Sequence, residues 1–218
     1  MTDEFCLRVA SLRGHDFEEF YSGTPPWDIG RPQPAFVALR DAGALRGPLL
    51  DVGCGTGEHA LMAAAQGLDA TGIDAAPTAI ERARKKARQR GLDVTFIVGD
   101  ALELSSRLDE TYNTVIDSAL FHVFNDDNRA RFVEQLHAVM RPGGRYLMLC
   151  FSDQVPGSVG PRRVTEAEIR TSFADGWLVE SVQPAELDTT DMAVPAYLAA
   201  ATRIWFSLRT GRCRLEAG

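Results

Sequence analysis

Leu49-Leu50-Asp51-Val52-Gly53-Cys54-Gly55-Thr56-Gly57 is the stretch that decides the fold. An apolar pair leads into an acidic residue, and three glycines then alternate with small side chains. The alanine-rich segment from Glu58 to Gly67 is typical of a helix. The pattern therefore predicts a strand, a tight glycine turn and a helix start. A ligand can approach the backbone of such a turn closely, because no Cβ is in the way and free N–H groups point outward.

The composition is that of an ordinary globular chain with an acidic surplus. The 218 residues suit one domain with a substantial core, and 45% of them are apolar. A net charge of −7 argues against a nucleic-acid partner. No signal pattern and no membrane-length apolar run is found, so we expect no membrane partner. The four cysteines form no C-x-x-C pair, which predicts no metal site, no disulfide framework and a cytoplasmic location.

Strands alternate with helices along most of the chain. Strands are expected at 48–52, 69–73, 93–98, 112–117 and 145–151, and helices at 34–43, 58–66, 77–91 and 126–140. This order predicts a Rossmann-like α/β fold, with a doubly wound, mostly parallel sheet of seven strands. The last two strands, at 177–182 and 197–208, are separated by a short loop and should form an antiparallel pair at the sheet edge. Thr165 and Glu168 predict a capping box at a helix start.

Ligands of such a sheet bind beyond the carboxyl ends of the strands. The glycine turn, Asp74, Asp100 and the pair Asp117-Ser118 all fall there. An acidic residue after the second strand can bind ribose hydroxyls. Dinucleotide enzymes use the same contact, so this residue alone does not identify the cofactor.

The spacing of the glycines narrows the choice of cofactor. A dinucleotide fingerprint requires G-x-G-x-x-G/A, and its third position here is Glu58, whose carboxylate would repel a pyrophosphate. A nicotinamide-dependent oxidoreductase is thus disfavoured, and a neutral or cationic ligand is favoured. The basic residues between Arg82 and Arg90 are interpreted as a solvated helix face.

The glycine stretch resembles the first motif of class I S-adenosylmethionine-dependent methyltransferases. Asp74, Gly99-Asp100-Ala101 and Arg141-Pro142-Gly143-Gly144 stand where that family has its later motifs, so the resemblance spans residues 48–151. It implies S-adenosyl-L-methionine as cofactor and S-adenosyl-L-homocysteine as product. The implied cofactor-binding residues are Asp51, Gly53, Cys54, Gly55, Thr56, Gly57, Asp74, Ala75, Asp100, Ala101, Asp117 and Ser118. In the family pattern Asp74 holds the ribose, Asp100 and Ala101 flank the adenine, and Asp117 and Ser118 lie near the methionine end and the substrate.

A second match lies in the proline-rich loop from Thr24 to Pro34. It is similar to the N-terminal loop of the thiopurine, thiol and halide methyltransferase branch, which implies that Trp27 packs against the cofactor. Small enzymes that methylate quinolone-type toxins are also similar. The implied acceptor is a small molecule with an aromatic or heterocyclic hydroxyl or nitrogen, or a thiol. We expect one domain over 1–218, with a lid (1–45), a cofactor-binding core (46–151) and a substrate-side edge (152–218).

Methyl transfer would be an in-line displacement that needs alignment and exclusion of water more than it needs a base. His122 follows the fourth strand and is the candidate base or substrate orienter, although its apolar surroundings slightly favour a histidine that is simply packed in the core. His15 and Tyr21 are weaker candidates, and His59 and His137 are interpreted as structural. Because no catalytic side chain is unmistakable, a non-catalytic cofactor-binding protein or partner subunit stays open as an alternative. The oligomeric state is not predicted.

Overall fold

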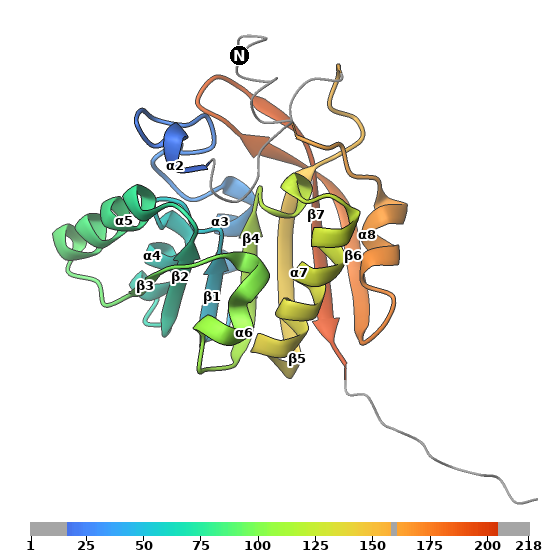
Figure 1. The fold of residues 1–218 in the computed structure, drawn as a ribbon, viewed down its shortest axis with the longest axis horizontal. Helices are drawn as coiled ribbons and strands as arrows, with labels where there is room; N and C mark the ends of the chain where they lie inside the picture. Colours follow the sequence, from blue (N-terminus) through green and yellow to red (C-terminus); the bar gives the residue numbers. More distant parts are fainter. Residues whose placement is uncertain (1–16, 158–160, 205–218) are drawn as a thin grey trace, which may run out of the picture.

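A twisted seven-stranded sheet forms the centre of the molecule (Figure 1). The computed structural model describes residues 17–157 and 161–204. The strand order is β3-β2-β1-β4-β5-β7-β6. The strands are β1 (Leu49–Val52), β2 (Ala70–Asp74), β3 (Thr95–Val98), β4 (Tyr112–Ser118), β5 (Met140–Phe151), β6 (Trp177–Asp188) and β7 (Ala193–Arg203). The first five are mutually parallel, and β7 runs antiparallel to both β5 and β6. The predicted fold, with its antiparallel pair at the edge, is confirmed.

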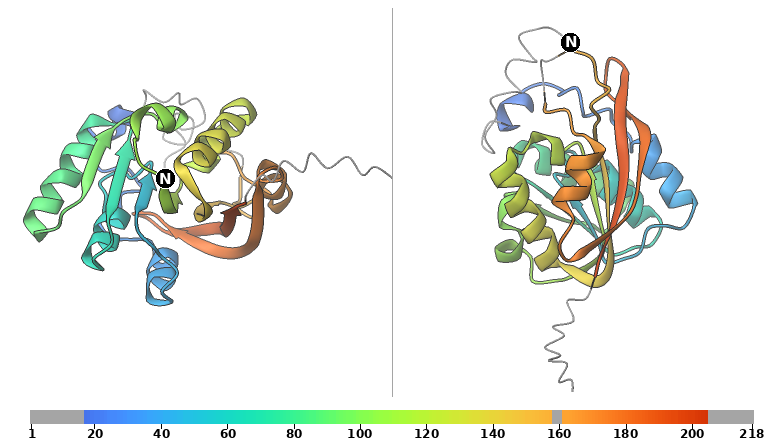
Figure 2. Two further views of the ribbon diagram at one scale, coloured as in Figure 1. Left: turned by 90° about the horizontal axis from the view of Figure 1, so that it is seen from below. Right: turned by 90° about the vertical axis from the view of Figure 1, so that its right-hand side faces the viewer.

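Helices cover both faces of the sheet (Figure 2). The longer ones are α3 (Pro34–Asp41), α4 (Glu58–Ala65), α5 (Pro77–Arg90), α7 (Asp126–Val139) and α8 (Glu166–Ser172); α2 (Phe17–Phe20), α6 (Leu104–Arg107) and the 3₁₀ turns η1 (Ala101–Glu103) and η2 (Phe121–Val123) are short. On β4, Val115 packs in the core with Phe132 of α7, whereas Ile116 packs on the other face with Phe36 of α3. Both faces of the central strand are thus buried, as a parallel sheet requires.

Most helix boundaries follow local sequence signals. Pro34 and Pro77 occupy the first turns of α3 and α5, and Gly91 ends α5 with φ +64°. The predicted capping box is present at α8, where Glu168 N–H donates to the Thr165 hydroxyl at 3.1 Å.

The largest differences from the predicted boundaries lie in the last three strands. β5 begins at Met140 instead of residue 145, because Met140 pairs with Tyr112 before a register shift at Thr114. β6 continues past residue 182 through Pro184, which an edge strand tolerates because one side of it has no partner to bond. β7 begins at Ala193 instead of residue 197. Its Pro195 lies just before Ala196, the first residue of β7 that pairs with β5. Residues 205–208 of the predicted last strand lie outside the described residues.

Gly72 in β2 offers a test of this packing. A Cβ at this position would lie 2.6 Å from Cε1 of Phe96 and 2.9 Å from Sγ of Cys54. Gly72→Ala should therefore lower the free energy of unfolding by roughly 1–3 kcal/mol through overpacking, measured by urea denaturation. Gly23→Ala is the control, because a Cβ there meets nothing within 4 Å. Equal stability of the two variants would contradict the packing described for β2.

Candidate functional site

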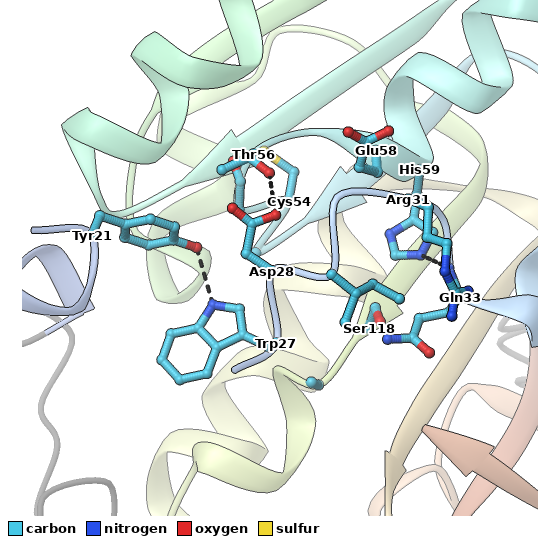
Figure 3. A pocket seen from close by; sticks show the side chains of 14 residues that line it. Tyr21, Trp27, Asp28, Arg31, Gln33, Cys54, Thr56, Glu58, His59 and Ser118 are labelled. Carbon is cyan, nitrogen blue, oxygen red and sulfur yellow. Dashed lines mark hydrogen bonds between the residues drawn. The ribbon is translucent and has the colours of Figure 1, made fainter. Parts of the chain in front are cut away.

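An open hollow with an empty volume of about 480 Å³ lies at the carboxyl ends of β1 and β4 (Figure 3). Its walls come from four segments: the loop at 21–33, the glycine turn at 53–56, the first turn of α4, and Ser118-Ala119 after β4. The hollow lies where open parallel sheets bind ligands.

The glycine turn depends on left-handed backbone conformations. Gly53, Gly55 and Gly57 have φ values of +65°, +52° and +85°, which residues with a Cβ rarely adopt. A Cβ on Gly53 would lie 3.1 Å from Leu120, and one on Gly55 would lie 2.9 Å from the Tyr21 hydroxyl. The turn is therefore in close contact with Leu120 and Tyr21, and the close approach of a ligand that the sequence predicts stays a prediction.

Asp74 and Asp100 both bind backbone N–H groups near the site. Asp74 accepts from Gly55 N–H at 2.8 Å and from Ala76 N–H at 2.9 Å, so it links the end of β2 to the glycine turn. Asp100 accepts from Leu102 N–H at 2.9 Å and caps η1, where Ala101 is buried. Each carboxylate oxygen can accept a further hydrogen bond, so the roles expected of Asp74, Ala75, Asp100 and Ala101 toward ribose and adenine stay predictions.

Asp117 faces the protein interior. Its carboxylate accepts hydrogen bonds from the Tyr146 hydroxyl at 2.6 Å and from the N–H groups of Leu120 at 2.8 Å and Phe121 at 3.1 Å. Burial raises its pKa to about 7, although these hydrogen bonds oppose the rise. Of the predicted pair, Ser118 lines the hollow, while the Asp117 carboxylate holds the segment that follows β4.

Ala119, next to Ser118, has a strained backbone. Its φ of +71° is the one positive value among the non-glycine residues that the structure describes. Its N–H donates to Leu149 O at 2.9 Å, which ties the segment to β5. Strain held in place by the surrounding structure is typical of functional sites.

The Trp27 loop, defined here as residues 24–33, is anchored to the glycine turn. Trp27 Nε1 donates to the Tyr21 hydroxyl at 3.1 Å, and its ring lies 5.3 Å from that of Phe20. Asp28 accepts from the Thr56 hydroxyl at 2.7 Å, as Figure 3 shows. Trp27 thus lines the hollow as the resemblance implies, and its contact with the cofactor stays a prediction.

The other side of the Trp27 loop is anchored to the hairpin of β6 and β7. The Gln33 amide donates to Asp188 O and accepts from Asp188 N–H, both at 2.8 Å. Arg31 pairs with the Asp188 carboxylate at 2.7 Å, and Thr190 N–H donates to Pro26 O at 2.9 Å. The loop therefore bridges the turn and the hairpin.

Glu58 turns toward α5. It accepts from Lys86 at 2.8 Å and from both Nη atoms of Arg90 at 2.8 and 2.9 Å. Burial would raise its pKa, but the hydrogen bonds from Arg90 and Lys86 outweigh this and lower it. Because the charge is compensated, repulsion by Glu58 no longer excludes a pyrophosphate.

The basic run on α5 is only in part the solvated face that the sequence suggested, because Arg82 and Lys86 are half-buried and bond to other segments. Besides Lys86 and Arg90, Arg82 donates to Tyr21 O at 2.6 Å, and Arg84 donates to Phe96 O at 2.6 Å. Long basic side chains can reach over a helix to buried acceptors, which helical spacing alone does not indicate.

His59 lines the hollow although the sequence pointed to a structural role. Its Nε2 accepts from Gln33 N–H at 3.1 Å, so its proton lies on Nδ1, 3.9 Å from Oδ1 of Asp51. Burial lowers the pKa of His59 to about 4. Sequence reasoning also missed the hollow-lining Asp28, Arg31 and Gln33; the similarity of the Trp27 loop was the available signal.

Asp51 lies beneath the turn at the start of α4. Its Oδ2 accepts from Ala60 N–H at 3.1 Å, and its Oδ1 has no hydrogen-bond partner among the described residues. Burial raises its pKa to about 8, with the Ala60 hydrogen bond opposing and the charges of Asp74 and Asp117 adding to the rise. The folded protein therefore holds this carboxyl group in its protonated form near neutral pH.

His122 is 3% exposed and belongs to η2. Its Nδ1 accepts from Phe151 N–H at 2.9 Å. Burial, with the charges of Arg129 and Arg163 adding to it, lowers its pKa to about 3. The ring is therefore neutral with its proton on Nε2, which makes it a hydrogen-bond donor. His122 is not among the side chains that line the hollow of Figure 3.

The other histidines lie elsewhere. His137 on α7 accepts from Arg203 Nε at 3.3 Å, close to the amino end of β5, and His15 lies outside the described residues.

In the described part of the chain, no helix has the length and apolar character to span a membrane.

Several known proteins are similar to this chain in sequence. A methyltransferase domain family matches residues 49–144. The 2-heptyl-1-hydroxyquinolin-4(1H)-one methyltransferase of Mycobacteroides abscessus is 38% identical over 181 residues, which are 82% of this chain and 79% of that protein. The chain belongs to the S-adenosylmethionine-dependent methyltransferases.

Further similarities agree with this family. A probable thiol methyltransferase 2 of Arabidopsis thaliana is 27% identical over 67% of this chain and 66% of its own length. A solved structure from work on the conversion of a disulfide bond into a thioacetal group during echinomycin biosynthesis has a TM-score of 0.81 and 38% identity, covering 89% of this chain and 94% of that one. The predicted family, fold, enzyme class and cofactor of this methyltransferase are confirmed, and no similarity supports a non-catalytic role.

The protonated state of Asp51 predicts a pH dependence of stability. Its pKa rises from 3.8 in the unfolded chain to about 8 in the folded one, so the folded state binds more protons between these values. Stability must then fall as pH rises toward 8, by at most about 1.4 kcal/mol per pH unit for one proton. His59 and His122 act in the opposite direction, but only below about pH 6.5.

Urea denaturation between pH 6.5 and 8 tests this expectation. Asp117 contributes with the same sign, because its pKa is also raised, to about 7. Asp51→Asn should flatten the slope, since the amide keeps an acceptor for Ala60 N–H and does not titrate. Asp191→Asn, an exposed change, is the control. An unchanged slope in Asp51→Asn would show that this carboxyl group is ionised in the folded protein.

Proposed function

We propose that this methyltransferase acts on a small-molecule acceptor, with an aromatic or heterocyclic hydroxyl or nitrogen, or a thiol, as the nucleophile. The observation that carries this proposal is the 38% identity to a hydroxyquinolone methyltransferase over about four fifths of both chains. The similarity to a thiol methyltransferase supports the softer nucleophile. The net charge of −7 supports a small acceptor over a nucleic acid. The free, buried thiols of Cys54 and Cys150 support a cytoplasmic location.

The hollow suits a sulfonium nucleoside. Its turn lacks Cβ atoms at Gly53, Gly55 and Gly57, and Asp28 contributes a carboxylate that no salt bridge neutralises among the described residues. A bound S-adenosylmethionine supplies an activated methyl group whose leaving group is a neutral thioether. We infer that residues 53–57 hold its methionine and ribose portions, with Trp27 packed against it, Asp74 and Ala75 at the ribose, and Asp100 and Ala101 at the adenine. Ser118, beside Asp117, then faces the methionine end and the acceptor.

When bound, S-adenosylmethionine would give its methyl group to the nucleophilic atom of the acceptor and leave as S-adenosylhomocysteine. The chain's part is to align the two reactants and to exclude water. The Trp27 loop lines the hollow and is hydrogen-bonded to the hairpin of β6 and β7, so we assign the lid to the N-terminal segment and the substrate side to the hairpin. An acidic hydroxyl or a thiol ionises without a protein base, which fits the neutral, proton-donating state of His122. We propose His122 as a substrate orienter through Nε2–H.

A panel of acceptors tests the proposed function. Purified protein and S-adenosylmethionine are incubated with 2-heptyl-1-hydroxyquinolin-4(1H)-one, a simple phenol, an aromatic nitrogen heterocycle and an alkyl thiol, and products are followed by mass spectrometry. We expect one methylated acceptor per S-adenosylhomocysteine formed. Binding of S-adenosylhomocysteine without transfer to any member would overturn the acceptor class.

His122→Asn tests the orienting role. The Asn oxygen can keep the hydrogen bond from Phe151 N–H, while the Nε2–H donor is lost. Loss of one substrate hydrogen bond should lower kcat/KM for hydroxyl acceptors roughly tenfold, with unchanged affinity for S-adenosylhomocysteine. His137→Asn is the control, because His137 lies far from the carboxyl ends of the strands. Full activity of His122→Asn would remove His122 from the mechanism.

A further inference from the structure

A chain of hydrogen bonds runs from the Trp27 loop to the middle of α5. The Thr56 hydroxyl donates to Oδ1 of Asp28 at 2.7 Å and accepts from Nζ of Lys86 at 2.7 Å. Lys86 also donates to Oε1 of Glu58 at 2.8 Å. A cation on a helix is thereby connected to a carboxylate in the hollow through one hydroxyl group.

The direction of these bonds is fixed by chemistry. An ammonium group can only donate and a carboxylate can only accept, so the single Thr56 proton must point to Asp28. Thr56 is 4% exposed and Glu58 is 7% exposed, and hydrogen bonds in such a low-dielectric setting strengthen one another. The charge of Lys86 therefore reinforces the bond that Thr56 makes to Asp28.

The close approach of α5 to the turn makes this connection possible. A Cβ on Gly57 would lie 2.9 Å from Cβ of Ala83, which is three residues before Lys86 on α5. With glycine at position 57, Lys86 reaches over the turn to Thr56.

Neutralising Glu58 does not require Lys86. Both carboxylate oxygens of Glu58 already accept from Arg90, at 2.8 and 2.9 Å. The other hydrogen bond that Lys86 donates goes to the Thr56 hydroxyl, and this bond links Lys86 to the site.

We propose that Lys86 is a positioning residue of the methyl-donor site. Acting through Thr56, it holds Asp28 and the Trp27 loop against the glycine turn, so that the Asp28 carboxylate faces the cationic methionine end of the cofactor. This role rests on the cofactor placement proposed above and not on the identity of the acceptor.

Calorimetry of S-adenosylhomocysteine binding to the full-length protein tests the role of Lys86. Lys86→Met keeps the aliphatic stem and removes the charge, and it should weaken binding roughly tenfold, the effect of one charge-assisted hydrogen bond. Lys86→Arg should restore most of the affinity. Lys85→Met is the matched control, since Lys85 is exposed on the same helix. In an Asp28→Asn background, Lys86→Met should have little further effect, because the two residues act in one chain.

Hydrogen exchange of the peptide spanning residues 24–33 gives a readout that needs neither cofactor nor acceptor. Exchange should be faster in Lys86→Met than in the wild type and unchanged in Lys85→Met. Should Lys86→Met fail to fold, Lys86→Gln takes its place. Wild-type affinity and wild-type exchange in the variant, or equal losses in Lys85→Met, would overturn the proposal. Absence of methyl transfer to the acceptor panel would overturn the acceptor class alone and leave these two measurements decisive for Lys86.

Discussion

The backbone of the turn between β1 and α4 is the constraint on which the site depends. Three glycines with positive φ leave it without Cβ atoms, and different parts of the chain pack into that space. Leu120 lies against Gly53, the Tyr21 hydroxyl against Gly55, and Phe96 and Ala83 against Gly57. The Asp74 carboxylate fixes the turn from below through Gly55 N–H. One short segment thus brings together the N-terminal loop, α5, and the segment after β4.

Buried carboxyl groups gather under this turn. Asp51, Asp74 and Asp117 end or nearly end three adjacent strands, and burial raises the pKa of each. Their shared function in the structure is to accept backbone N–H groups that the turn and the neighbouring helix starts leave unpaired. A cationic ligand bound above them, as we propose for the methyl donor, would favour their ionised forms.

The Trp27 loop connects the two halves of the site. On one side it meets the glycine turn through Asp28 and Thr56, and on the other it meets the hairpin through Gln33 and Asp188. Gln33 is 3% exposed and bonds to both backbone groups of Asp188, so movement of the hairpin must move the loop. The Trp27 loop and the hairpin, which we propose to lie at the donor and the acceptor side, are therefore mechanically linked.

The sequence by itself determined the alternation of strands and helices, the glycine turn, the α8 capping box and the methyl donor. The first three follow from periodicity and from backbone limits that act within a few residues, whereas the methyl donor was implied by the resemblance of the motifs to a known family. Only the tertiary structure decided that Glu58 bonds to Lys86 and Arg90, that Asp117 faces Tyr146, and that Gln33 clamps Asp188, 155 residues away. Such pairs depend on how distant elements pack. Local patterns carry no record of that packing, and a polar side chain near a strand end can therefore serve either the ligand or the fold.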